Sequence, residues 1–263
     1  MILFVFEGEK REPTLFRTML HLFFPQIKDK ILCSYKNNIY NLYRKINETD
    51  ESQDIVSVLR QKWQGEPDNP FKDIYTTSDI SEIYLFFDYD CQNQTKGKEL
   101  TLQQLNQQME ELLSFFDDET GNGKLYVNYP MIESIRYTKL LPDKNYISYT
   151  IPISECINFK QRAAEFSAYP NLDFISFKYD NKKNSLKIPN NEQCETIKQN
   201  WQYLKEQNVR KALLLTTGSK QIPQKKELIS QHDIFSSQIR KYIKVDNSVS
   251  VLNSLPLFLY EYF

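Results

Sequence analysis

One stretch decides the fold, Ile83-Tyr84-Leu85-Phe86-Phe87-Asp88-Tyr89-Asp90. It is an uninterrupted apolar run that is followed by two acidic residues, Asp88 and Asp90. Such a run predicts a strand that is covered on both faces, as in a parallel sheet flanked by helices. Residues 2–6 form a second run of the same kind. Shorter apolar stretches at 31–35 and 125–127 predict two more strands of this sheet.

Helical patterns separate these strands along the chain. Apolar residues repeat at helical spacing between Pro13 and Pro25, and further helices are predicted at 38–46, 54–62 and 101–116. Strands that alternate with helices indicate βαβ units. We therefore predict an α/β fold, with a doubly wound and mostly parallel sheet, for residues 1–140.

Residues 141–263 have a different pattern, in which helical signals dominate. We expect this part to be a mainly helical extension packed on the sheet. The apolar runs at 174–177 and 212–215 fit late strands and buried helical turns equally well. Helical patterns cover residues 158–166, 192–207 and 225–244.

The charges are unevenly distributed although the net charge is only −1. Residues 178–244 contain 14 Lys and Arg against 6 Asp and Glu, so this segment carries +8 and the remainder −9. A basic segment beside an acidic one suits a protein that guides phosphates with one part and places metal ions in the other. The alternative is a solvated, lysine-rich helical surface.

Several classes of protein are disfavoured by what the sequence lacks. There is no Cys-x-x-Cys spacing and there are only 2 His, which argues against a zinc site and fits reduced thiols. Residues 216–220 lack the spacing of a phosphate-binding loop. No apolar run approaches roughly 18 residues, and residues 1–6 are too short for a signal peptide, so we expect a cytoplasmic protein without a membrane partner. The four cysteines are Cys33, Cys91, Cys156 and Cys194.

Acidic residues follow two of the predicted strands. Glu7 comes directly after the first strand, and Asp88 and Asp90 come directly after the third. Ligands bind at the carboxyl ends of parallel strands, so these carboxylates are expected at one edge of the sheet. Oxygen ligands of this kind suit Mg²⁺ or Mn²⁺. Strand-end acids also serve as helix caps and turn formers, which is the alternative reading.

A divalent cation at these carboxylates would support phosphodiester hydrolysis. Without a cation the clustered charges would repel one another and raise at least one pKa. With one, a phosphoryl oxygen is polarised and water becomes a stronger nucleophile. Gly8 would remove side-chain bulk where a phosphate backbone approaches.

The arrangement resembles the Toprim domain of topoisomerases, primases and OLD-type nucleases, which carries Glu-Gly after its first strand and Asp-x-Asp after its third. Here these motifs are Glu7-Gly8 and Asp88-Tyr89-Asp90. The stretch 7–13, followed by Phe16, is more similar to the RloB-like Toprim proteins of prokaryotic anti-phage defence loci. Their Asn-Pro-x-x-Glu element is similar to residues 128–133, with one extra residue before the proline. The resemblance covers about residues 1–140.

The resemblance implies a role for each acidic residue. Asp88 and Asp90 would hold Mg²⁺, and Glu7 would bind metal or act as general acid or base. Glu12 would orient the first helix or bind a second ion, with helix capping as the alternative. Glu133 is a further candidate ligand, and a plain surface position is its alternative.

Lys10 and Arg11 lie beside the acidic motif and are candidates for contacts with substrate phosphates. We therefore expect a metal-dependent nuclease for DNA or RNA, as an effector of anti-phage defence. The alternative is a non-catalytic or partner-activated binding or sensor subunit that works with a separate ATPase. A phosphoacceptor receiver domain is disfavoured, because Glu7-Gly8 is not the acidic pair that such domains need. Whether the chain forms homo- or hetero-oligomers is left open by the sequence.

Overall fold

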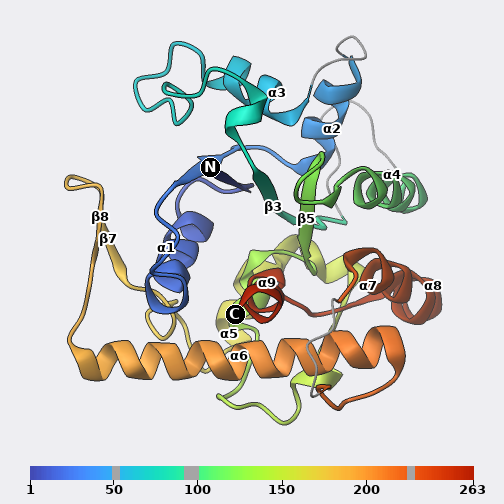
Figure 1. Cartoon of the computed structure of the whole chain (residues 1–263). Coiled ribbons are helices and arrows are strands. Elements are labelled where there is room, and N and C mark those ends of the chain that lie inside the picture. The colour runs from blue at the N-terminus through green and yellow to red at the C-terminus, as the bar shows by residue number, and fades with distance from the viewer. Residues whose placement is uncertain (49–53, 92–100, 224–228) are drawn as a thin grey trace.

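The computed structural model describes residues 1–48, 54–91, 101–223 and 229–263. Its centre is a five-stranded sheet in the order β2-β1-β3-β5-β4 (Figure 1). Strands β1, β2, β3 and β5 run parallel, and only the short β4 is antiparallel. The mixed α/β fold with a mostly parallel sheet is therefore confirmed. The strands are β1 (Ile2–Phe6), β2 (Lys30–Ser34), β3 (Glu82–Asp88), β4 (Asp117–Asp118) and β5 (Gly123–Asn128).

Helices and two small antiparallel sheets complete the described structure. The helices are α1 (Arg11–Phe23), α2 (Ile39–Glu48), α3 (Ile55–Trp63), α4 (Leu102–Phe115), α5 (Phe159–Phe166), α6 (Asn191–Thr217), α7 (Gln231–Gln238), α8 (Lys244–Asp246) and α9 (Ser254–Tyr262). One sheet pairs β6 (Thr150–Pro152) with the distant β9 (Ser248–Ser250), and the other is a hairpin of β7 (Lys178–Asp180) and β8 (Ser185–Lys187). Single turns of 3-10 helix lie at Thr77–Asp79, Ile132–Arg136, Tyr146–Ser148 and Ile153–Asn158, and a π-helical turn at Ile239–Ile243 joins α7 to α8.

Helices α3 and α4 begin where local side chains cap them. The Thr101 hydroxyl accepts a hydrogen bond from the Gln104 N–H at 3.2 Å, and the Gln104 side chain accepts one from the Thr101 N–H in return. Asp54 caps α3 in the same way, through the Ser57 N–H at 2.8 Å. These caps supply partners for N–H groups that the first turn of a helix leaves unpaired.

The second half departs from the predicted boundaries. Helix α6 continues ten residues beyond the predicted end at 207, and the ambiguous run 212–215 lies inside it. The other ambiguous run, 174–177, forms turns and irregular chain. Part of the predicted helix at 225–244 lies outside the described residues, and its remainder is α7, the π turn and α8.

One face of the sheet carries an aromatic core under α1, α6 and α9. The rings of Phe6, Phe86 and Tyr126 stack across three neighbouring strands, with centroids 5.4 Å and 5.3 Å apart. Phe258 of α9 meets the Phe86 ring edge-on, with ring centroids 5.4 Å apart. The Phe16 ring of α1 packs against Phe258, with centroids 5.6 Å apart. The first and last helices of the chain thus cover the same strands.

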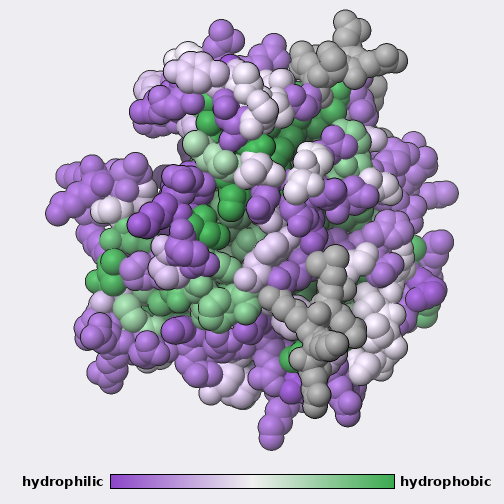
Figure 2. All heavy atoms as spheres, viewed as in Figure 1, coloured by the Kyte–Doolittle hydropathy of each residue, from purple (hydrophilic) through white to green (hydrophobic). Residues whose placement is uncertain are grey.

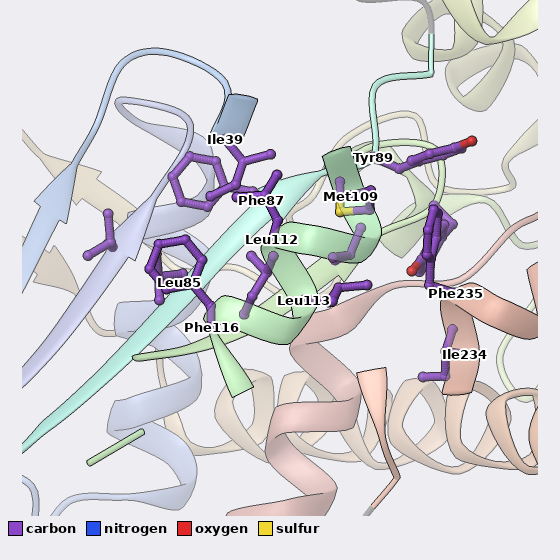
Figure 3. Packing of buried hydrophobic residues seen from close by; sticks show 14 of the residues in the cluster. Ile39, Leu85, Phe87, Tyr89, Met109, Leu112, Leu113, Phe116, Ile234 and Phe235 are labelled. Atoms are coloured by element: carbon purple, nitrogen blue, oxygen red, sulfur yellow. The ribbon is translucent and has the colours of Figure 1, made fainter. Parts of the chain in front are cut away.

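The opposite face is covered by α2, α3, α4 and α7. Leu85 and Phe87 of β3 point into this core, and Met109 and Leu112 of α4 pack over them (Figure 3). Phe235 of α7 lies at the end of the same cluster. Because residues 141–263 supply helices to both faces, the sheet of the first half is enclosed by the second half.

The surface in this view is mostly hydrophilic, and the β7–β8 hairpin projects at its left side (Figures 1 and 2). Among the described residues, no helix combines the length and apolar character that crossing a membrane requires.

We predict that α9 contributes strongly to stability. Phe258→Ala should lower the free energy of unfolding by about 3–5 kcal/mol, because it leaves a cavity against six core rings. Phe263→Ala is the matched control, since this ring is 53% exposed, and it should cost less than about 1 kcal/mol. Chemical denaturation measures both, and equal losses would show that α9 is not a core helix.

Candidate metal centre at the carboxyl edge of the sheet

Glu7 and Asp88 meet where β1 and β3 end. Phe6 lies beside Phe86 in the parallel register, and the Glu7 N–H continues the ladder to the Phe86 carbonyl at 3.1 Å. The Glu7 side chain then folds back, and its Oε2 accepts a hydrogen bond from the Asp88 N–H at 3.1 Å. The two strand-end acids are therefore neighbours, as the sequence predicts.

Asp88 is held from the other side by Asn128, the last residue of β5. The two residues are register partners, and the Asn128 Nδ2 donates to Asp88 Oδ1 at 3.0 Å. The Asn128 Oδ1 in turn accepts from the Ser254 N–H at 3.0 Å and the Ser254 hydroxyl at 2.8 Å. Asn128 thus orients a buried carboxylate, a role that the sequence does not indicate.

Glu12, in the first turn of α1, is buried and turned toward the strand end. Its Oε1 accepts a hydrogen bond from the Gly8 N–H at 3.0 Å. A Cβ on Gly8 would stand only 2.2 Å from Glu12 Oε2. The expectation that Gly8 leaves room for a phosphate is therefore wrong, because the Glu12 carboxylate fills that space.

Glu133 is buried beside this group and forms an ion pair with Arg11. Arg11 begins α1, Glu133 lies in the 3-10 turn after β5, and the Arg11 Nη1 donates to Glu133 Oε1. The Glu133 side chain is 6% exposed and that of Arg11 37%. Arg11 thus supplies a positive charge inside the acidic cluster, and it also borders the cleft described below.

Asp90 is placed differently from the other acids. Its backbone is left-handed, with φ of 46°, and its N–H donates to the Pro130 carbonyl at 3.1 Å. The side chain is partly buried and does not line the cleft described below. Its charge still lies close enough to Glu7 to raise the pKa of that carboxyl.

A cleft of about 1480 Å³ opens above these residues. Glu7, Glu12, Asp88 and Glu133 lie in it, and the last three of them are buried. The more exposed residues of the cleft include cations from several elements. These cations are Lys10, Arg11, Arg17, Lys36, Lys72 and Lys160.

The basic segment 178–244 contributes little to this cleft. Its described residues that border the cleft are Tyr179, Asn181 and Asn184, none of which is charged. Lys211 is buried instead, where its Nζ donates to the Tyr146 carbonyl at 3.1 Å and the Tyr149 carbonyl at 2.6 Å. The positive charges of the cleft therefore come from residues 10–72 and from Lys160.

Burial of the clustered acids disfavours their charged forms. Burial raises the pKa of the Glu7 carboxyl from its ordinary 4.5 to about 8, although the Asp88 N–H opposes this change. The charges of Asp90, Glu12 and Glu133 raise it further. Burial also raises the pKa of Asp88 well above its ordinary value, and the pKa values of Glu12 and Asp90 shift upward for the same reason. A nearby cation would relieve this cost.

The donor set suits a hard divalent cation in its chemistry, because it consists of carboxylate oxygens with an amide beside them. Among the described residues, however, no three His, Cys, Asp or Glu side chains converge closely enough to hold a metal ion. Glu133 is engaged by Arg11 and Glu12 by the Gly8 N–H. These side chains would have to turn toward one another to share an ion.

Comparisons of the chain with protein-family models, with curated proteins and with solved structures found no match.

We predict that Gly8→Ala displaces the Glu12 carboxylate and breaks its hydrogen bond to residue 8. The variant should lose about 1–3 kcal/mol of unfolding free energy in metal-free buffer. Gly121→Ala is the matched control, because its Cβ would meet nothing closer than 3.7 Å, and it should stay within about 1 kcal/mol of wild type. Equal stability of the two variants in denaturant melts would contradict this account of Gly8.

The raised pKa of Glu7 predicts a pH dependence of stability. The unfolded chain loses this proton near pH 4.5 and the folded chain near pH 8, so the folded state binds more protons in between. The free energy of unfolding of the metal-free protein should therefore fall as the pH rises from 4.5 to 8. This group accounts for at most about 1.4 kcal/mol of that fall per pH unit. In Glu7→Gln the fall should be shallower, as measured by thermal melts from pH 5 to 8. An unchanged slope would show that Glu7 ionises normally.

Proposed function

We propose that this chain is a divalent-metal-dependent nuclease that hydrolyses the phosphodiester bonds of DNA or RNA. The observation that carries the proposal is that four carboxylates from three segments of the chain line one large cleft, three of them buried. Buried like charges cost stability, and a divalent cation would offset that cost. The exposed lining of the cleft mixes cations with the acids Glu9, Glu66 and Asp68, and its cations could pair with substrate phosphates.

The proposed chemistry divides the work among the acidic residues. Asp88, oriented by Asn128, would hold Mg²⁺ or Mn²⁺, with Glu12 and Glu133 as further ligands. When bound, the ion supplies a Lewis acid for the phosphoryl oxygen and lowers the pKa of water. Glu7 would accept the proton of the attacking water, because a bound cation would lower its raised pKa toward neutral pH and favour the carboxylate.

In the proposed hydrolysis the water oxygen forms a bond to phosphorus while its proton passes to Glu7. The bridging P–O bond breaks, and the leaving sugar oxygen takes up a proton from solvent. Lys10 and Arg11 lie at the cleft, where each can neutralise a phosphate oxygen of the strand.

The placement of the motifs supports an enzyme of Toprim type. Glu7-Gly8 follows β1 and Asp88-Tyr89-Asp90 closes β3 of a parallel sheet. On the resemblance to RloB-like proteins, we propose that the enzyme acts in prokaryotic anti-phage defence. Asp90 would act on the ion through Glu7 without contacting it, because Asp90 does not line the cleft but its charge raises the pKa of Glu7.

A second candidate is a subunit that needs a partner to become active. The pairing of Arg11 with Glu133 favours it, because this ion pair occupies a carboxylate that the metal would need. A partner such as an ATPase, by drawing Arg11 away, would free Glu133 for the ion.

Cleavage of a mixed panel of plasmid, single-stranded DNA, tRNA and rRNA tests the proposal. With Mg²⁺ or Mn²⁺ the wild type should cut at least one substrate, and EDTA should stop it. Asp88→Asn and Glu7→Gln should each reduce the cleavage rate more than about 100-fold. This exceeds the loss of about 10- to 100-fold that is expected when a residue only hydrogen-bonds a metal ligand. Glu110→Gln, an exposed acid on α4, should cut like wild type.

Thermal shift with Mn²⁺ separates the remaining outcomes. Stabilisation that Asp88→Asn abolishes, without cutting, would favour the partner-activated subunit. If Mn²⁺ neither stabilises the protein nor supports cutting, the metal-dependent nuclease is ruled out.

A further inference from the structure

Two aromatic side chains border the cleft on opposite sides of the strand ends. Trp63 ends α3 and packs against the core on the α2–α4 face of the sheet. Tyr179 belongs to β7, whose hairpin adjoins α1 on the other face. Both rings are partly exposed. Figure 1 shows the loop after α3 and the β7–β8 hairpin projecting toward the left of the view.

Each ring is paired with a cation that also borders the cleft. The Lys36 Nζ lies 4.9 Å from the centre of the Trp63 ring, and the Arg17 guanidinium 4.7 Å from that of Tyr179. The Tyr179 hydroxyl donates to the Asn184 side chain across the hairpin, which holds the ring in place. Each cation lies over the face of its ring, and Lys36 also forms an ion pair with Glu9 at 2.8 Å. A base that takes the place of the cation over the ring would stack there, and the displaced cation would meet the phosphate of the same nucleotide.

The depth of the acidic group restricts what can reach it. Asp88 is 9% exposed and Glu12 5%, so the reacting phosphate must enter between the two sides of the cleft. A duplex keeps its bases paired and stacked inside, and it would offer the two rings only sugar and phosphate. A single strand can bring one phosphate to the acids while its bases turn toward the rings.

We propose that the cleft binds a single strand of nucleic acid with unstacked bases, which stack on Trp63 and Tyr179 on either side of the acidic group. This inference rests on the proposed nuclease function for the identity of the polymer. It adds that single strands, not duplexes, are the substrate class. Single-stranded DNA and RNA share the chemistry that the rings and cations recognise, so both are probed.

Fluorescence anisotropy with labelled oligothymidylate, oligouridylate and a duplex of equal length tests the inference, in Ca²⁺ at fixed salt. At least one single strand should bind roughly tenfold or more tightly than the duplex. Tyr179→Ala should weaken that binding about 5- to 100-fold, the range expected for one stacked base, and Tyr179→Phe should retain it. Tyr75→Ala is the matched control, because Tyr75 is 76% exposed and does not line the cleft.

Intrinsic fluorescence reports on the other side of the cleft. The chain has 2 Trp, and Trp201 is fully buried in the α6 core. A stacked base should therefore quench the Trp63 emission, and Trp63→Phe should abolish the quenching while anisotropy still reports binding. Which of the two single strands binds more tightly identifies the sugar that the cleft accepts.

The outcomes separate this inference from the nuclease proposal. Tyr179-dependent binding of single strands without metal-dependent cutting would support the inference and count against the nuclease. Cutting of duplexes in preference to single strands would support the nuclease and overturn the inference. Equal affinity for duplex and single strands, or wild-type binding by Tyr179→Ala with an unchanged melting temperature, would also overturn it.

Discussion

The register of β3 between β1 and β5 is the constraint on which the acidic group depends. In this register Phe6 lies beside Phe86 and Asp88 beside Asn128, so β3 and β5 end together, two residues beyond the end of β1. Glu7 and Asp88 follow from that alignment, and Asn128 is then within hydrogen-bonding reach. A slip by one residue would turn every strand side chain to the opposite face, which two separate hydrophobic cores oppose. The packing of the two hydrophobic cores, far from the carboxyl edge of the sheet, thus keeps the carboxylates of Glu7 and Asp88 together.

If the acidic group holds a divalent ion as proposed, the arginine within it gives the site two electrostatic states. With Arg11 on Glu133, part of the negative charge is already compensated inside the protein. A divalent ion and Arg11 would compete for the same carboxylate, so binding of one weakens binding of the other. Such competition would link the position of Arg11, the first residue of α1, to the binding of an ion at the carboxylates.

Much of the fold could be predicted from the sequence, because strands buried on both faces read as uninterrupted apolar runs. The end of α6 could not, since its last turns pack against the opposite core from its first turns and lose their one-sided pattern. The run 174–177 is apolar without being a strand. Its backbone is held by side chains, with the Trp201 Nε1 donating to the Ile175 carbonyl and the Phe177 N–H donating to Thr18. Contacts between distant residues of this kind leave no local pattern.

The candidate site was predictable to a similar degree. Strand ends locate Glu7 and Asp88, but the left-handed turn that carries Asp90 off the cleft wall depends on a bond to Pro130. The charge count of residues 178–244 was a poor guide, because a count does not distinguish a lysine in solvent from one such as Lys211. That lysine is enclosed, and its ammonium group bonds to two carbonyls.

The sharing of one aromatic core by the first strand and the last helix has a consequence for synthesis of the chain. During translation, Phe4 and Phe6 emerge long before Phe258, which covers them in the folded protein. Ser254, which anchors Asn128, also emerges late. Domains fold as their segments leave the ribosome, so the acidic edge reaches its final geometry only after α9 is made. A nascent chain would therefore carry the acids of the site without their final arrangement.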